Sequence, residues 1–322
     1  ARGGCSPAVD ELWRYSHGDA RHGSRYFDEH SQHQEADSDL DMRPARQDWL
    51  QSALGLQFKP FIARWRDQLS EPASQFCEWS INGEHLGHLD KRHLPTIVNA
   101  FEIAGIPLAE SAKSFDLRTQ AGPQELSAFL MTVANLLRAQ GLVPGWRHEE
   151  QLVMNSQGEV LATAERALFK TLGLRSRAVH VHVENHQGLV WTGVRAATKH
   201  ENPGMLDNLA AGGIASSETT DSTLWRELDE EAGLNSDDFA WIERLPPHEL
   251  VLSRPLLYGG WHHETVILFH GQLKPGRRPS NRDGEVAAFQ LMSRSACTQA
   301  INAWQFTPDA ALCCALALTA AK

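Results

Sequence analysis

Long apolar runs are missing from this sequence of 322 residues. No stretch approaches the roughly 20 apolar residues that a membrane-spanning helix needs, and the first 45 residues hold no apolar segment typical of a secretory signal. We therefore expect a soluble protein that is not embedded in a membrane. Hydrophobic residues still make up 42% of the chain, enough for a normal core, and the length predicts two domains.

An excess of positive charge is also missing. The sequence has 30 Lys and Arg against 40 Asp and Glu, which gives a formal net charge of -10. A nucleic-acid surface needs many cations to neutralise phosphates. The charge balance therefore argues against a nucleic-acid partner and suits a cation site better.

Cysteine is scarce, and its spacing excludes two kinds of site. None of the five cysteines stands in a CxxC pair: Cys5, Cys77, Cys297, Cys313 and Cys314. We expect neither a disulfide framework nor a cysteine zinc site. A reducing cytoplasm is the compartment that this usage predicts.

Residues 1–47 are polar and show neither helical nor strand periodicity, so we predict a disordered extension. Met42 stands just before the first hydrophobic pattern. This position leads to the hypothesis that residues 1–41 are dispensable for function. Four histidines of the extension are interpreted as solvated and not as metal ligands: His17, His22, His30 and His33.

The remaining sequence predicts an α/β protein, α+β overall, with two modules. In the N-terminal α+β module, residues 48–175, we expect two strands joined at Asn82-Gly83 and helices near 94–101, 123–140 and 161–171. In residues 176–322, alternating apolar residues predict a mixed sheet with helices packed on it. Its elements are a hairpin of Val179–Val183 and Leu189–Arg195, a helix near 220–232, strands at 263–273 and 285–292, and a helix at 309–319.

One segment, "GGIASSETTDSTLWRELDEEAGL", concentrates glutamates at a regular spacing. An α-helix advances about 100° per residue, so Glu227, Glu230 and Glu231 share one arc while Leu224 and Leu228 lie on another. Neighbouring like charges repel. A hard divalent cation with oxygen ligands, Mg²⁺ or Mn²⁺, would compensate them and would bridge to a diphosphate.

The ends of this segment are suited to a loop, a helix and a second loop. Thr219 or Thr220 can cap the helix, and Gly233 can end it in the left-handed conformation. Gly212 and Gly213 allow a tight loop near a phosphate or metal. The alternative interpretation is an exposed helix with an acidic face, which is what most such strings are when the flanking glycines are absent.

The segment resembles the Nudix box, G-x5-E-x7-R-E-U-x-E-E-x-G-U, at every fixed position from Gly212 to Leu234. The resemblance implies a Nudix α/β/α sandwich over residues 176–322, and an enzyme that uses Mg²⁺ to activate water for attack on a diphosphate. By position, it implies that Glu227, Glu230 and Glu231 bind the metal, with Glu227 also taking the proton from water. Two further roles are implied: an additional or outer ligand for Glu218, and an orienting ion pair for Arg226.

A narrower resemblance extends from about residue 48 to the end of the chain. The segments "ATAERALF", "RAATKHENPGMLDNLAAGGI", "DGEVAAFQLM" and "FTPDAALCCAL" are similar to Nudix proteins related to the domain fused to fungal thiamine pyrophosphokinase. That subfamily implies hydrolysis of thiamine diphosphate, or of its oxo and oxy analogues, to the monophosphates. Two departures are Ser217 in place of glycine and Gly193-Val194-Arg195 in place of a double arginine.

Weaker candidates flank the box. Arg195 and Lys199 are candidate diphosphate ligands, with solvated surface charge as the alternative. Glu285, beside Asp283, is a candidate for an additional carboxylate near the metal, with an exposed turn as the alternative. Aromatic residues near the strands, which we interpret as core and not as substrate contacts, are Trp191, Trp261, His262 and His263.

Three rival functions stay open at this point. The box recognises the diphosphate and not the attached group, so a nucleoside diphosphate derivative such as ADP-ribose is an alternative substrate. An isomerase acting on isopentenyl diphosphate would share the fold and the metal. A binding module without catalysis is the third, although an intact box argues against it.

Overall fold

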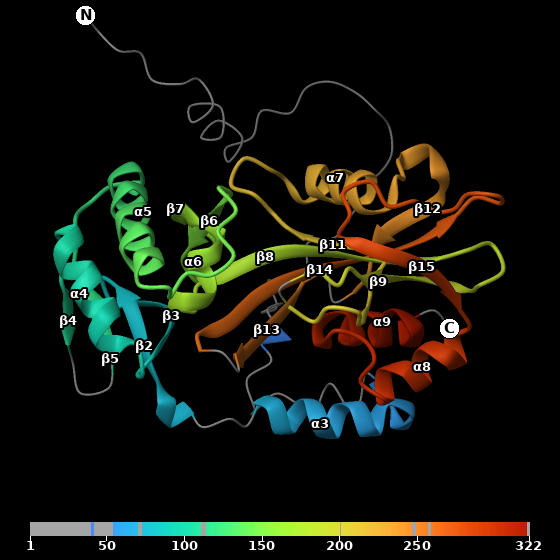
Figure 1. The fold of residues 1–322 in the computed structure, drawn as a ribbon, viewed down its shortest axis with the longest axis horizontal. Coiled ribbons are helices and arrows are strands. Elements are labelled where there is room, and N and C mark those ends of the chain that lie inside the picture. The colour runs from blue at the N-terminus through green and yellow to red at the C-terminus, as the bar shows by residue number, and fades with distance from the viewer. Residues whose placement is uncertain are drawn as a thin grey trace, which may run out of the picture. The chain divides into compact units, whose positions relative to one another are not determined.

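A computed structural model describes residues 40–41, 54–69, 73–110, 114–199, 201–246, 249–256 and 259–320 (Figure 1). The predicted extension, apart from the two-residue strand β1 (Leu40–Asp41), lies outside the described residues, as do Met42 and the four N-terminal histidines. No helix in the described ranges is both long and apolar enough to span a membrane.

Residues 76–174 have a core of their own. A four-stranded sheet in the order β3-β2-β5-β4 and a separate β6–β7 pair provide its strands, and α4, α5 and α6 contribute apolar side chains to the same core. The elements are β2 (Phe76–Ile81), β3 (Glu84–Asp90), α4 (Leu94–Ala104), β4 (Leu108–Glu110), β5 (Ser114–Leu117), α5 (Pro123–Ala139), β6 (Glu150–Met154), β7 (Val160–Glu165) and α6 (Arg166–Leu172). Short 3-10 turns at Leu56–Phe58 and Ala73–Gln75 precede them.

A nine-stranded sheet organises the described C-terminal part. It is mixed, because β8 and β14 run parallel while β9, β11, β12, β13 and β15 pair antiparallel with their neighbours. The strands are β1, which pairs in parallel with β13, and β8 (Arg175–Glu184), β9 (Val190–Arg195), β10 (Leu206–Asp207), β11 (Ala210–Gly213), β12 (Phe239–Arg244), β13 (Leu250–Pro255), β14 (Trp261–Leu273) and β15 (Val286–Met292).

Helices cover both faces of this sheet. Helix α7 (Thr220–Ala232) shares a core with Val179 and Val181 on one face, and a 3-10 turn (Ser236–Asp238) follows it. On the other face, α3 (Lys59–Leu69), α8 (Arg294–Asn302) and α9 (Pro308–Ala320) share a core with Leu268. Figure 1 shows α7 on one side of the strands and α3, α8 and α9 on the other. The expected α/β/α sandwich with a mixed sheet is confirmed.

Most predicted elements are found, but the helix predicted at 161–171 is wrong in its first half. Residues 160–165 form strand β7, and the helix begins only at Arg166, where the Glu165 side chain accepts a hydrogen bond from the Ala167 N–H. The burial of residues 160–164 alternates as in a strand. Pairing with β6 decides the conformation, because a short apolar run is compatible with either structure.

Residues 54–65 were grouped with the N-terminal module in the sequence analysis. In the structure, Leu54, Phe61 and Trp65 are buried in the same core as α8 and α9. The Phe61 N–H donates to Asn302 Oδ1 at 3.2 Å, which joins α3 to the end of α8. The N-terminal segment of the chain therefore helps to cover the C-terminal sheet.

Candidate active site

Helix α7 positions the glutamates, and its two ends are fixed by the residues that the sequence indicated. Thr219 Oγ1 accepts a hydrogen bond from the Ser222 N–H at 3.1 Å, and Ser222 Oγ accepts one from the Thr219 N–H at 2.9 Å. Gly233 ends the helix with a φ of 63°, the left-handed region that favours glycine. These two caps fix the first and last residues of the helix.

The three helix glutamates do not share one environment. Glu227 and Glu231 are buried, with 7% and 9% of their surface exposed, whereas the Glu230 side chain is half exposed. Glu227 and Glu231 face strand β11, where the Ala211 N–H donates to Glu231 Oε2 at 2.9 Å. The structure thus brings Glu227 and Glu231 together and places Glu230 at their solvent side.

Gly212 lies directly under the Glu227 carboxylate. A Cβ atom built on Gly212 would overlap the carboxylate of Glu227. Only a glycine lets the strand pass this close to the helix side chain. Gly212 is predicted to allow a close approach of the backbone. In the structure, the group that approaches is the Glu227 carboxylate.

Arg226 joins the carboxylates of the segment into one network. Its Nε donates to Glu218 Oε1 at 2.5 Å, and its Nη1 donates to Glu227 Oε1 at 2.7 Å and to Glu230 Oε2 at 3.0 Å. Its Nη2 also donates to the Gly213 carbonyl at 3.2 Å. One guanidinium therefore ties the helix to the end of strand β11 and to the loop that carries Glu218, a geometry that its planar fork of donors permits.

Burial sets the acidity of these groups. Desolvation raises the pKa of Glu231 well above its ordinary value, and the nearby charge of Glu227 raises it further. Desolvation likewise raises the pKa of Glu227. Hydrogen bonds from Arg226 hold the pKa of Glu218 below its ordinary value. Two buried carboxylates that resist ionisation favour a positively charged ligand between them.

A second acidic segment, just before strand β15, meets the helix. Glu231, Asp283 and Glu285 each offer an oxygen within 4.8 Å of the others. Lys199 forms an ion pair with Glu285, and Arg147 lies 3.5 Å from the same carboxylate. Burial raises the pKa of Glu285, but the hydrogen bond from Lys199 and the charges of Lys199, Arg147 and Arg166 together outweigh burial, so the pKa lies below its ordinary value. The oxygen donors of this group fit a hard divalent cation.

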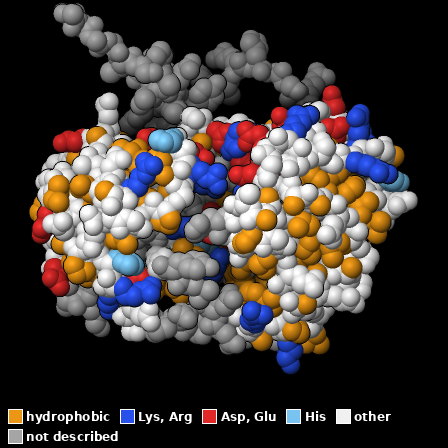
Figure 2. Space-filling model, viewed as in Figure 1, with side chains coloured by type: hydrophobic (Ala, Val, Ile, Leu, Met, Phe, Trp, Pro, Cys, Tyr) orange, Lys and Arg blue, Asp and Glu red, His pale blue; other side chains and the backbone are white. Residues whose placement is uncertain are grey.

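A cavity of about 300 Å³ opens beside these carboxylates, between the two halves of the chain. Figure 2 shows a hollow near the middle of the viewed face, with charged side chains around it. Arg195 and Lys199 line both this cavity and a smaller one that reaches Glu231 and Glu285. Further charged residues of the large cavity are Asp90, Arg147, Arg166, Lys170 and Glu201.

Arg195 is held in place by its own chain. Its Nη1 donates to Asp207 Oδ2 at 2.7 Å, and its Nη2 donates to the Glu201 carbonyl at 3.0 Å. Because Arg195 and Lys199 line both cavities, they lie between the large cavity and the carboxylates of Glu231 and Glu285. Neither is a freely solvated surface charge, because their side chains are only 21% and 16% exposed.

The N-terminal part also contributes to this site, which sequence spacing alone does not indicate. A Cβ on Gly213 would overlap the Gln151 amide and contact the Arg166 guanidinium. Gln151 is 3% exposed, and its Oε1 has no hydrogen-bond partner among the described residues. The Ser216 N–H donates to the Glu150 carbonyl at 2.7 Å. Only Arg166 had a sequence signal, because it lies in the "ATAERALF" segment.

The aromatic candidates have packing roles. Trp191 is 9% exposed and belongs to the core under α7. Trp261 stacks on His88 with ring centroids 4.2 Å apart. His262 Nε2 lies 3.3 Å from Asp309 Oδ2, and burial lowers the pKa of His263 to about 3.

The fold and the site together define a class: an α/β/α sandwich in which a capped helix places glutamates over two glycines beside a cationic cavity. These glycines, Gly212 and Gly213, end strand β11 and do not form the predicted tight loop. Comparison with known families agrees with this class. Residues 174–310 match the NUDIX domain model, so this part of the chain is a Nudix domain.

Two plant proteins of similar sequence are named Nudix hydrolases. The chain is 29% identical over 234 residues to Nudix hydrolase 20, chloroplastic, of Arabidopsis thaliana, covering 69% of this chain and 62% of that protein. It is 28% identical over 191 residues to Nudix hydrolase 24, chloroplastic, of the same plant, covering 58% and 52%. A solved structure, DR0079 from Deinococcus radiodurans, is 20% identical with a TM-score of 0.39 and covers 49% of this chain and 92% of that one. The chain therefore spans less than two thirds of both plant relatives.

Proposed function

We propose that the protein hydrolyses a diphosphate linkage with Mg²⁺, for which Mn²⁺ can substitute, and that its substrate is thiamine diphosphate or an oxidised analogue. The products would be the monophosphate and phosphate. The burial of Glu227 and Glu231 against the end of strand β11, next to a cavity lined with cations, is the observation that carries this proposal.

Each side chain of the network has a task in this reaction. Glu227, Glu230 and Glu231 would hold the cation, with Glu285 as an additional carboxylate and Glu218 as a further or outer ligand. When bound, the cation would supply Lewis-acid chemistry, neutralising the diphosphate and lowering the pKa of water. Glu227 would accept the proton of the attacking water, and Arg226 would keep the carboxylates oriented.

The diphosphate would lie between the carboxylates and the large cavity. Arg195 and Lys199 stand at that point, and the backbone of Gly212 and Gly213 can approach the phosphate closely because these residues lack side chains. Cationic side chains suit the oxygens of a diphosphate. The rest of the substrate would occupy the cavity, where Arg147, Arg166 and Lys170 contribute from the N-terminal part.

The choice of thiamine diphosphate rests on the segments that resemble the thiamine-related subfamily. Two of these segments line the large cavity: "RAATKHENPGMLDNLAAGGI" contains Arg195, Lys199 and Glu201, and "ATAERALF" contains Arg166. Asp90 and Glu201 also line the cavity, where Asp90 pairs with Arg92 and Glu201 pairs with Lys170.

A substrate panel tests this proposal. Purified protein is given thiamine diphosphate, oxothiamine diphosphate, ADP-ribose or isopentenyl diphosphate, each with Mg²⁺ and with chelator, and phosphate and monophosphate are measured. We expect phosphate from the thiamine compounds with Mg²⁺ alone. Faster turnover of ADP-ribose would overturn the substrate, and conversion of isopentenyl diphosphate without phosphate release would overturn the hydrolysis.

We further propose a reducing cytoplasm as the working compartment and a small molecule, not a nucleic acid, as the partner. The thiol state of the cysteines supports the first, since Cys77, Cys297, Cys313 and Cys314 are free and buried. The net charge of -10 supports the second.

A further inference from the structure

A buried cluster of two histidines and a glutamate lies on the face of the sheet opposite α7. His182 and Glu184 are two residues apart on β8 and therefore point to the same side, and His270 on β14 is the registered partner of His182. Their side chains are 1%, 8% and 7% exposed. The parallel pairing of β8 and β14 thus places three metal-binding side chains in one buried corner.

Two ring nitrogens in this corner, one on each histidine, lack hydrogen bonds among the described residues. His182 Nε2 and His270 Nε2 are buried and find no hydrogen-bond partner among the described residues. They lie 3.9 and 3.8 Å from one and the same atom, Glu184 Oε1. Buried polar atoms are normally satisfied, so two unsatisfied nitrogens aimed at one carboxylate oxygen indicate a missing ligand.

We propose that His182, Glu184 and His270 bind a divalent transition-metal ion of the zinc class, at a site separate from the Nudix carboxylates. The three ligand atoms lie within 4.8 Å of one another. Tetrahedral zinc with bonds near 2.1 Å requires ligand atoms about 3.4 Å apart, so small side-chain rotations would complete the site. Two imidazoles and one carboxylate suit zinc better than magnesium, which prefers oxygen alone.

The protonation of the corner is compatible with metal binding. Burial lowers the pKa of His270 to about 4 and also lowers the pKa of His182. Both rings are therefore neutral near pH 7 and have a lone pair for a metal.

The groups around the corner would hold its ligands in place. Arg294 Nη2, at the start of α8, donates to Glu184 Oε1 at 2.7 Å and orients the carboxylate. The Trp241 ring from β12 contacts the His270 ring edge-on, with centroids 4.9 Å apart. Outer contacts of this kind fix the ligands of a metal site. The corner does not depend on the proposed hydrolysis, since none of its residues lines the cavity.

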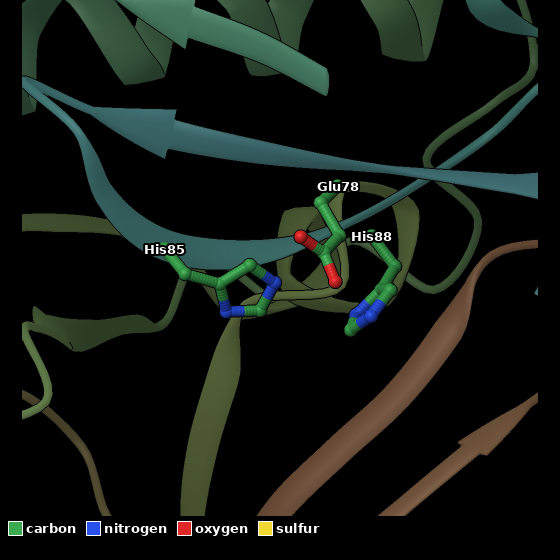
Figure 3. Close-up of side chains that lie close together, drawn as sticks. All are labelled: Glu78, His85 and His88. Atoms are coloured by element: carbon green, nitrogen blue, oxygen red, sulfur yellow. The ribbon is translucent and has the colours of Figure 1, made fainter. Parts of the chain in front are cut away.

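An exposed cluster on the N-terminal sheet provides a matched control. Glu78, His85 and His88 on the β2–β3 hairpin also bring two rings and a carboxylate together (Figure 3). Glu78 and His85 are exposed, whereas all three residues of the buried corner are covered by protein. The two clusters have the same ligand types and differ in burial.

Cobalt spectroscopy distinguishes the clusters. The full chain is stripped of metal and titrated with Co²⁺, which absorbs strongly in the visible in tetrahedral sites with nitrogen ligands and weakly in six-coordinate oxygen sites. We expect a strong band that saturates and that Zn²⁺ abolishes. The double substitution His182→Gln/His270→Gln should remove the band, and His85→Gln/His88→Gln should leave it unchanged. Loss of the band only in the second variant, or no band in the wild type, would overturn the site.

Folding of the first variant is checked by circular dichroism. If it does not fold, X-ray absorption of the Zn²⁺-loaded His85→Gln/His88→Gln variant replaces it. Two imidazoles in the zinc shell support the buried corner, and a shell of oxygens alone overturns it. Phosphate release from thiamine diphosphate is followed in parallel, so that failure of the hydrolysis is recorded separately from failure of the zinc site.

Discussion

Glycine is required at position 212 because the Glu227 carboxylate occupies the place where a side chain would begin. The strand backbone and the helix side chain are in close contact at this point. Any added atom would move the Glu227 carboxylate, the strand, or both. The contact therefore couples the strand to the proposed base.

Substitution of Gly212 by alanine should displace Glu227 and lower kcat about a hundredfold, since a misplacement of about 1 Å has an effect of this size. The control is Gly122→Ala, at a glycine with a negative φ and no neighbour within 4 Å of an added Cβ. Both variants are assayed for phosphate release, with circular dichroism to verify folding. Wild-type kcat in Gly212→Ala would contradict the proposed role of Glu227.

The raised pKa of Glu231 predicts a pH dependence of stability in the absence of metal. Because the folded pKa lies above the unfolded value of about 4.3, the stabilising contribution is complete below that pH and is lost as the pH rises through the folded pKa. In chelator, the melting temperature should fall as the pH rises above about 4.3 and through the raised pKa of Glu231, and Mg²⁺ should reverse the fall.

Glu231→Gln is the matched variant for this measurement, because it removes the charge and keeps the shape. It should show a smaller fall of melting temperature with pH in chelator and a smaller gain from Mg²⁺. Equal pH slopes in the wild type and the variant would show that the burial of Glu231 does not control stability.

At the scale of elements, helix α7 could be predicted almost completely from the sequence. Thr219 and Gly233 mark its ends, and the apolar spacing marks its buried face. What could not be predicted was the difference between Glu230 and its neighbours Glu227 and Glu231. The helical spacing puts all three on one arc, but the position of strand β11 decides which of them is buried.

Strand β7, in contrast to α7, was not predicted from the sequence. The apolar run at 160–165 was assigned to a helix, because spacing alone does not separate a short strand from the first turn of a helix. Its pairing with β6 brings Gln151 and Arg166 to Gly213. The error therefore concealed the elements that complete the cavity.

Removal of the cations that β7 and its neighbours contribute should weaken substrate binding. We expect Arg147→Ala/Arg166→Ala to raise KM about tenfold with little change in kcat, as is usual for a lost charge-assisted contact. Steady-state kinetics with thiamine diphosphate measure both constants. The control is Arg118→Ala, whose side chain is 81% exposed and pairs with Asp116 outside the cavity. An unchanged KM in the double variant would exclude these arginines from the substrate site.

At the scale of the whole molecule, the described chain forms one site from two parts. The Nudix domain supplies the carboxylates, and residues 90–171 supply much of the cavity wall. The sequence predicted the sandwich with its mixed sheet, because this depends on local periodicity, whereas the division into modules of residues 48–175 and 176–322 stays a prediction. It could not predict which N-terminal side chains face the glutamates, since that contact depends on how the two cores pack.

The central claim is that this site is a metal-dependent diphosphate hydrolase. Its most direct test is phosphate release from thiamine diphosphate by the variant Glu230→Gln/Glu231→Gln in the presence of Mg²⁺. We expect a loss of about a hundredfold or more relative to the wild type, because the cation would lose two charged ligands. The control is Glu243→Gln, an exposed glutamate on β12, which should retain wild-type activity. Wild-type phosphate release by the double variant would contradict a metal-dependent hydrolase at this site.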